Sequence, residues 1–297
     1  MRSTRALRLL IVLTALSVPS GAICAQRYWH DDQGRDAFHL DIWLPFLKDT
    51  MAFKGHKFFT GAIVPSVSIR AGDGIRVEGD FPMMRAGFQP GTGSKLQSFR
   101  IGNPYLGIRI GDDEKLVSGV LGARVPVGKK PTNFESQMAV SAGAVSNFDE
   151  FEAFNPNLLT FRGALELRRV RPNGFLIGLR GGPSLQMNTS GAPQADTEIY
   201  FDYGARLGFQ GKSALATAAL TGRYLITAPG FDFACQPAFP AGCDPKSFNA
   251  RTHHAISGVV ELRPGRIRPR ATLRFPLDKD LRIQEGAVLG VGLSIAH

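Results

Sequence analysis

Charged side chains recur at alternate positions of this chain, most densely in "GRIRPRATLRFPL" at residues 265–277. In an extended chain Arg266, Arg268, Arg270 and Arg274 fall on one face, and the residues between them, which are mostly apolar, fall on the other. Guanidinium groups bind carboxylates and phosphates, or pair with acidic side chains of their own chain. The run therefore predicts a β-strand with one cationic face and one apolar face.

Other alternating stretches add arginines and acids to such polar faces. The further arginines are Arg76, Arg109, Arg124, Arg162, Arg168, Arg180, Arg206, Arg223 and Arg263. The acids are Asp41, Glu78, Asp80, Glu166, Glu198, Asp202 and Glu261. These seven carboxylates cannot neutralise all thirteen arginines, and an unpaired charge away from water is costly. We therefore expect the polar faces to line a space that holds water or binds anions.

Catalytic and metal-binding patterns are weak in this sequence. His39 and Asp41 share a face of a predicted strand, but no serine nucleophile context accompanies them, so we interpret them as a structural pair. His253 and His254 begin a strand and are expected at its rim. Glycine-rich stretches such as "GTGSK" lack the strand–loop–helix unit of a phosphate loop. The sequence predicts no enzyme, no metal site and no cofactor.

The first 25 residues have the features of a secretory signal. Three arginines precede a short apolar run, and "PSGAICAQ" offers small residues before a cut after Ala25. We expect a signal peptide at 1–25, an N-terminal segment at 26–36 and a single barrel domain at 37–297. No later apolar run is long enough for a transmembrane helix.

Two of the three cysteines remain after such a cut. Cys235 and Cys243 are eight residues apart in "CQPAFPAGC", and export to an oxidising compartment predicts a disulfide between them. A metal site with the nearby histidines is the weaker alternative. The net charge of +10 permits an anionic partner. Nucleic acid is not expected as a partner, because the arginines are spaced two apart within strands and no lysine-rich tail is present.

Twelve stretches of alternating polarity organise the rest of the chain. They lie near 37–46, 58–70, 74–83, 98–110, 115–127, 158–169, 174–187, 197–210, 213–227, 254–263, 266–276 and 286–297. Most are longer than the five or six residues or so that are usual for strands of soluble proteins. A tilted strand that crosses a membrane needs about 9–11 residues.

The connections between these stretches alternate strictly in length. The short ones are "AGDG" (71–74), "GDDE" (111–114), "RPNG" (171–174), "QGKS" (210–213) and "RPG" (263–265), and the long ones are 47–57, 84–97, 128–157, 188–196, 228–253 and 277–285. Outer-membrane barrels show this pattern. We therefore predict an all-β fold, an antiparallel transmembrane β-barrel of about twelve strands with short periplasmic turns and long outer loops. A strand at 137–145 would make the count odd, so 128–157 is assigned to an outer loop that could hold a short helix.

The stretch "RIGNPYLGIRI" at 100–110 changes parity, which indicates a bulge near Gly102, Asn103 and Pro104. Its "GNPYLG" resembles a strand motif of outer-membrane proteins grouped with the meta-pathway phenol-degradation family, which are thought to transport small organic molecules. The whole mature chain resembles bacterial outer-membrane barrels. That resemblance implies the outer membrane of a Gram-negative-type envelope and the barrel-assembly machinery as a partner. Such barrels typically end on an aromatic residue, whereas this chain ends on His297.

The expected function is the passage of small solutes, anionic or organic, through an arginine-rich lumen, with outer-membrane lipid around the barrel. We predict that the lumen is lined by Arg124, Arg162, Arg180, Arg206, Arg223, Arg263, Arg266, Arg268, Arg270, Arg274, Glu166, Glu198, Asp202 and Glu261. Small residues on the same faces, such as Gly178 and Gly292, leave open space or accommodate large neighbours. Two alternatives remain: a non-conducting structural or surface-binding barrel, and a secreted ligand-binding β-sandwich.

Overall fold

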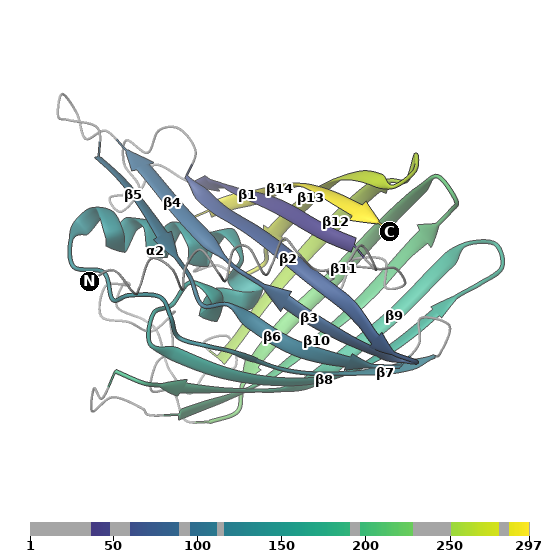
Figure 1. Cartoon of the computed structure of the whole chain (residues 1–297), viewed down its shortest axis with the longest axis horizontal. Coiled ribbons are helices and arrows are strands. Elements are labelled where there is room, and N and C mark those ends of the chain that lie inside the picture. Colours follow the sequence, from purple (N-terminus) through teal and green to yellow (C-terminus); the bar gives the residue numbers. More distant parts are fainter. Residues whose placement is uncertain are drawn as a thin grey trace, which may run out of the picture.

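The computed structural model describes residues 37–47, 60–88, 96–111, 116–190, 197–227, 251–278 and 285–296. Its strands are β1 (Ala37–Leu47), β2 (Gly61–Gly72), β3 (Ile75–Asp80), β4 (Met83–Phe88), β5 (Leu96–Ile101), β6 (Tyr105–Ile110), β7 (Val117–Arg124), β8 (Leu158–Val170), β9 (Phe175–Asn188), β10 (Thr197–Gln210), β11 (Ala214–Leu225), β12 (Thr252–Leu262), β13 (Ile267–Pro276) and β14 (Glu285–Ala296). All pairings are antiparallel, and β1 pairs with both β2 and β14. The sheet therefore closes into a barrel (Figure 1).

Two of the barrel strands are interrupted. β3 and β4 both pair with β2, on either side of Phe81 and Pro82, so together they form one strand. β5 pairs with β4 and β6 pairs with β3, so these form a second strand, which is broken at 102–104 where the parity change predicted a bulge. The fourteen segments thus make a closed barrel of twelve antiparallel strands, which confirms the predicted fold and shows that the β-sandwich alternative is wrong.

The third barrel strand is longer than predicted. It runs on to Phe88 rather than ending near 83, because β4 continues along β2 after the interruption and pairs with β5. The loop expected at 84–97 is correspondingly shorter.

Side chains alternate between the two faces of each strand. In β8, Phe161, Leu165 and Leu167 are exposed on the outside, whereas Thr160 and Glu166 are buried inside. Exposed leucine, isoleucine, valine and phenylalanine side chains continue around the barrel. Such a belt avoids water when it faces lipid, and a closed barrel leaves no unpaired strand edge within the membrane. None of the described helices is long and apolar enough to cross a membrane.

The two ends of the barrel differ. One end, which we call the turn end, carries the short connections, including those between β8 and β9 and between β10 and β11. The opposite end, which we call the loop end, carries the long connections. β1 begins and β14 finishes at the turn end, where Ala37 pairs with Ala296.

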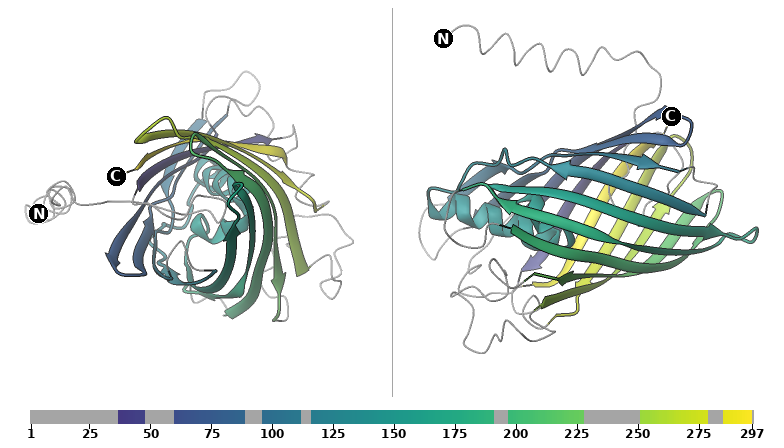
Figure 2. Two further views of the ribbon diagram at one scale, coloured as in Figure 1. Left: turned by 90° about the vertical axis from the view of Figure 1, so that its right-hand side faces the viewer. Right: turned by 90° about the horizontal axis from the view of Figure 1, so that it is seen from below.

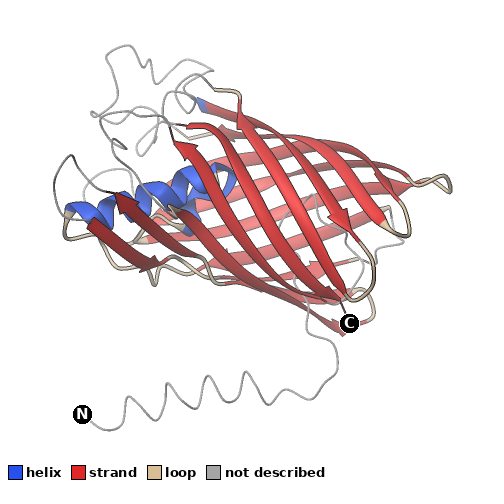
Figure 3. Cartoon of the chain, turned by 90° about the horizontal axis from the view of Figure 1, so that it is seen from above, coloured by secondary structure: helices blue, strands red, loops and turns tan. Residues whose placement is uncertain are grey.

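The long connection between β7 and β8 folds into the barrel. It contains α2 (Phe134–Ser146) and the 3-10 helix η1 (Phe148–Ala153), which together are called the plug. Figures 2 and 3 show the plug inside the ring of strands at the loop end. Asn133 caps α2, because its side chain accepts a hydrogen bond from the backbone of Ser136 and the Ser136 hydroxyl accepts one from the backbone of Asn133. The segment does contain a helix, but the helix lies inside the barrel rather than in an outer loop.

Candidate functional site

The first helix of the plug packs against an apolar part of the inner wall. Ala139 and Ala142 are completely buried. Their cluster consists of Trp43, Leu47, Ala62, Val64, Met84, Ala86, Met138, Ala139, Ala142, Ala144, Val145, Phe148, Ala153, Phe154, Ala255 and Val288. A Cβ atom on Gly143 would lie 2.6 Å from the ring of Phe154, so only glycine allows this close approach. The small residues of α2 bring its backbone close to the wall.

The break between β5 and β6 anchors the plug. The side-chain amide of Asn103 donates hydrogen bonds to the carbonyl oxygens of Glu152 (3.0 Å) and Asn155 (2.6 Å), and its oxygen accepts one from the backbone N–H of Gly128 (3.1 Å). Its backbone N–H donates to the carbonyl oxygen of Ala153 at 2.7 Å. Asn103 therefore ties the chain on both sides of the plug to the barrel wall.

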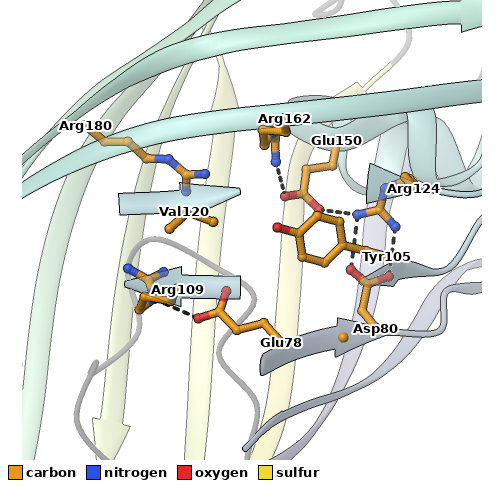
Figure 4. A pocket seen from close by; sticks show the side chains of 10 residues that line it. Glu78, Asp80, Tyr105, Arg109, Val120, Arg124, Glu150, Arg162 and Arg180 are labelled. Carbon is orange, nitrogen blue, oxygen red and sulfur yellow. Dashed lines mark hydrogen bonds and ion pairs between the residues drawn. The ribbon is translucent and has the colours of Figure 1, made fainter. Parts of the chain in front are cut away.

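The acidic side chains of η1 pair with arginines of the wall. Glu150 lies 3.1 Å from Arg124 and 2.6 Å from Arg162. In Figure 4 the guanidinium group of Arg124 lies between Glu150 and Asp80, whose Oδ1 is 2.8 Å from Nη1 of Arg124. Glu150 thus bridges two strands, β7 and β8.

The other two acids of η1 reach farther around the barrel. Glu152 lies 3.0 Å from Arg223 on β11, which also pairs with Asp202 on β10 at 2.6 Å. Asp149 lies 3.3 Å from Arg274 on β13 and accepts a hydrogen bond from the hydroxyl of Thr221 at 3.2 Å. Through its three carboxylates η1 is held by four strands of the wall, β7, β8, β11 and β13.

Aromatic rings flank two of these arginines. The guanidinium carbon of Arg223 lies 5.3 Å from the ring centre of Phe151 in η1 and 5.2 Å from that of Tyr200 in β10. That of Arg274 lies 5.1 Å from the Trp43 ring and 5.3 Å from the Phe148 ring. Cation–π contacts of this kind add stability where the cation has lost water.

The turn-end half of the interior contains a second set of charges. Arg109 binds Glu78 (2.7 Å) and Glu166 (2.5 Å), and Arg180 lies 3.5 Å from Glu166. These residues come from β3, β6, β8 and β9. Arg168 donates a hydrogen bond to the side-chain oxygen of Gln210 at 2.7 Å.

The opposite wall of this half is built by β1, β12 and β13. Nε of Arg270 donates a hydrogen bond to Asp41 at 2.9 Å. Glu261 is shared between Arg263 at 2.9 Å and Arg268 at 4.0 Å. Among the described residues Asp41 is therefore paired with Arg270 and not with His39, so the two residues do not form the pair that the sequence suggested.

Charge is distributed unevenly between the two halves. At the loop end the interior residues are Arg124, Arg162, Arg223 and Arg274 with Asp80, Asp149, Glu150, Glu152, Glu198 and Asp202. At the turn end the strands contribute Arg76, Arg109, Arg168, Arg180, Arg206, Arg268 and Arg270 with Asp41, Glu78, Glu166 and Glu261. The excess of arginines expected from the sequence is therefore confined to the turn-end half, because η1 adds three carboxylates to the other.

Most of the predicted lining residues lie on the inner face of the barrel, with two exceptions near the β12–β13 turn. Arg266 is exposed in that turn, before β13 begins at Ile267, so its assignment to the inner row of arginines is wrong. Arg263 also lies outside the strands but reaches inward to Glu261. Glu198 accepts a hydrogen bond from the hydroxyl of Tyr200 at 2.7 Å.

The inward-facing glycines make room for large neighbours. A Cβ atom on Gly178 would lie 2.6 Å from Nε of Arg206, and one on Gly292 would lie 2.2 Å from the carboxylate of Asp41. The alternative interpretation of these glycines, accommodation rather than open space, fits this geometry. A small cavity of about 20 Å³ remains among Glu78, Tyr105, Arg109 and Arg124, and Figure 4 shows it. It has room for about one water molecule.

The remaining candidates are at the rim or outside the described residues. Nε2 of His254 lies 2.6 Å from the hydroxyl of Tyr203, and Nδ1 lies 3.6 Å from Asp278. In the part of the chain that the structure describes, no group of three or more His, Cys, Asp or Glu side chains could hold a metal ion. Cys235, Cys243 and the signal segment 1–25 lie outside the described residues, so the disulfide and the cleavage stay predictions.

No family model and no curated protein matches the sequence. Solved structures do match. The COG4313 outer membrane channel from Pseudomonas putida F1 has a TM-score of 0.53 at 9% identity, over 92% of this chain and 99% of that one. The translocator domain of the autotransporter NalP from Neisseria meningitidis has a TM-score of 0.51 at 9% identity, over 99% of this chain and 96% of that one. The chain has the fold of bacterial outer-membrane barrels, and its apolar belt fits that location.

The expectation that the chain is not an enzyme requires correction. One fold can host many different functions, so the barrel fold found here does not exclude catalysis. The weak catalytic patterns of the sequence were not sufficient grounds for that exclusion.

Proposed function

We propose that this protein is an outer-membrane channel for small solutes and that it prefers anions. The observation that carries the proposal is the turn-end half of the interior, where seven arginines face four carboxylates. Positive charge on the wall of a narrow passage lowers the free energy of an anion inside it and raises that of a cation. The likeness to the COG4313 channel supports a transport role in general.

The plug sets a condition on this function. α2 and η1 occupy the loop-end half, and the side chains that surround them are buried. Passage therefore requires part of the plug to move. η1 is the better candidate to move, because its acidic side chains are held by ion pairs that water and solute ions can replace, whereas α2 is held by apolar packing.

The "GNPYLG" motif does not identify the solute. Its asparagine, Asn103, anchors the plug, so the motif has a structural role in this chain. The positive charge of the arginine-rich half does not distinguish organic anions from inorganic ones. The proposal also includes the signal peptide at 1–25, the N-terminal segment at 26–36 and the barrel-assembly machinery as a partner.

The alternative of a non-conducting barrel also rests on an observation. The ion pairs between η1 and the wall link four strands across the interior, as a scaffold would require. The two functions differ in one measurable property, which is whether the purified protein carries ions across a lipid bilayer.

The experiment is a reversal-potential measurement on the protein in planar bilayers, under a KCl gradient. The double variant Arg168→Gln/Arg268→Gln removes two positive charges from the turn-end half, and we expect its reversal potential to shift toward that of potassium. Arg169→Gln is the matched control, because Arg169 follows Arg168 in β8 but is exposed on the outer face. It should keep the reversal potential of the unmodified protein.

Two results would contradict the proposal. If the folded, unmodified protein gives no current, the barrel is a scaffold. If current flows with the same ion preference in the double variant, the turn-end arginines do not line the path.

A further inference from the structure

Four inward-facing residues form one row across the turn-end half of the barrel. Arg268 on β13 pairs in register with Ser294 on β14, Ser294 pairs with His39 on β1, and His39 pairs with Ser66 on β2. Directly paired residues have Cβ atoms about 4.5–5.5 Å apart. Ser68 lies two positions along from Ser66 on the same face, closer to the turn end. All five side chains are at least nine-tenths buried.

Three polar atoms of this group have no hydrogen-bond partner among the described residues. They are Nδ1 of His39 and the hydroxyl oxygens of Ser66 and Ser68. Buried polar atoms are nearly always paired, because one left unpaired has lost its hydrogen bonds to water without gaining a replacement. The Ser294 hydroxyl differs from them, because it donates to the carbonyl oxygen of Arg268 at 3.4 Å. The three atoms therefore point to a polar ligand that they would contact together.

The chemistry of the group favours an anion over a cation. Both serine hydroxyls and one imidazole nitrogen can donate hydrogen bonds, and none of these groups carries a negative charge. Arg268 adds a positive charge to the row. A cation would need free carboxylates, but Asp41 is paired with Arg270, Glu78 with Arg109, and Asp80 with Arg124.

We propose that His39, Ser66, Ser68 and Arg268 form a binding site for a small oxyanion at the turn end of the lumen. The hydroxyl and imidazole donors contact the oxygens, and the arginine supplies the charge that a carboxylate or phosphate group requires. The site lies on the path proposed above, so its role in transport rests on that function. Binding itself does not rest on it, because the row lies in the turn-end half of the barrel and the plug occupies the other half.

The test is a calorimetric titration of the detergent-solubilised protein with inorganic phosphate at low ionic strength. We expect saturable binding at one site. The double variant Ser66→Ala/Ser68→Ala should bind phosphate at least tenfold more weakly. Ser184→Ala is the matched control, because Ser184 is equally buried and its hydroxyl also has no partner among the described residues, but it lies on β9, outside the row. Its affinity should be unchanged.

His39→Leu provides a second, independent variant and should also weaken binding. Folding of each variant is checked by the heat-dependent shift in gel mobility that closed barrels show. Absence of saturable phosphate binding would overturn the site, as would equal losses in the serine double variant and in Ser184→Ala. A protein that binds phosphate at this site but gives no current would keep the site and lose the channel. A protein that conducts anions but does not bind phosphate in this way would keep the channel and lose the site.

Discussion

The two helical segments of the plug meet the barrel wall through different forces. α2 buries alanines and other small residues against Trp43, Ala62, Val64 and Met84. η1 directs three carboxylates at arginines on four strands. Apolar packing has no preferred direction and is hardly weakened by salt. A buried ion pair is strong only while both partners are in place, because each charge has already lost its water. If the barrel is a channel, as proposed, this difference predicts that α2 fixes the plug and that η1 determines whether the passage is open.

The largest expected effect comes from breaking the apolar contact. Phe154 is almost completely buried, and its ring packs against Gly143 of α2. Phe154→Ala should lower the free energy of unfolding by about 3–5 kcal/mol, because it removes a large buried side chain and leaves a cavity. Guanidinium titration of the refolded protein in lipid vesicles measures this change.

Phe134→Ala is the control for this prediction. Phe134 is the first residue of α2 and is exposed, so its removal should change stability by less than about 0.5 kcal/mol. Equal losses in the two variants would mean that packing inside the barrel does not hold the plug.

A smaller loss is expected at Asn103, which anchors the chain on both sides of the plug to the wall. Asn103→Ala removes three side-chain hydrogen bonds and leaves the carbonyls of Glu152 and Asn155 and the N–H of Gly128 without that partner. We expect a loss of about 2–3 kcal/mol and faster proteolysis of the segment 125–157. Asn188→Ala, which removes one local hydrogen bond from the backbone of Ser190, should cost less than about 1 kcal/mol. Proteolysis at the unmodified rate in Asn103→Ala would exclude the anchor.

The barrel could be predicted from the sequence because its signal is local. Alternation with period two, strand length and loop length are each visible within a few dozen residues. They gave twelve strands and the break at 102–104. Arg266 was misplaced by the same reasoning, because alternation continues past the end of a strand into a turn, where it no longer determines the face.

The plug could not be predicted in the same way. A helix inside a barrel contacts protein on most sides, so the apolar stripe that marks a surface helix is absent. The buried residues of α2 include Ser136, Gly143 and Ser146 beside alanines. The three acids of η1 lie in a segment without strand periodicity, so they were left out of the comparison between arginines and carboxylates. Their number could have been noticed, but which arginines they meet depends on the tertiary fold.

Of the three test variants, the one with the smallest expected loss of stability lies in η1, and it separates the roles of the two segments most directly. Glu152→Gln removes the charge that faces Arg223 and Arg162, but Asp202 still pairs with both arginines. The loss of stability should therefore be only about 1–2 kcal/mol. The effect on conductance should be larger than that on stability, since η1 loses charge-assisted contacts while α2 keeps its packing. We expect this variant to open more often than the unmodified protein in planar bilayers. The difference in opening frequency should become smaller as the KCl concentration is raised, because salt weakens the ion pairs of η1 in both proteins. Glu135→Gln is the matched control, because it also removes one negative charge, in the first turn of α2 rather than in η1. It should leave the opening frequency unchanged. If Phe154→Ala raised the opening frequency more than Glu152→Gln did, packing of α2 would control the passage, and the roles assigned to the two segments would have to be exchanged.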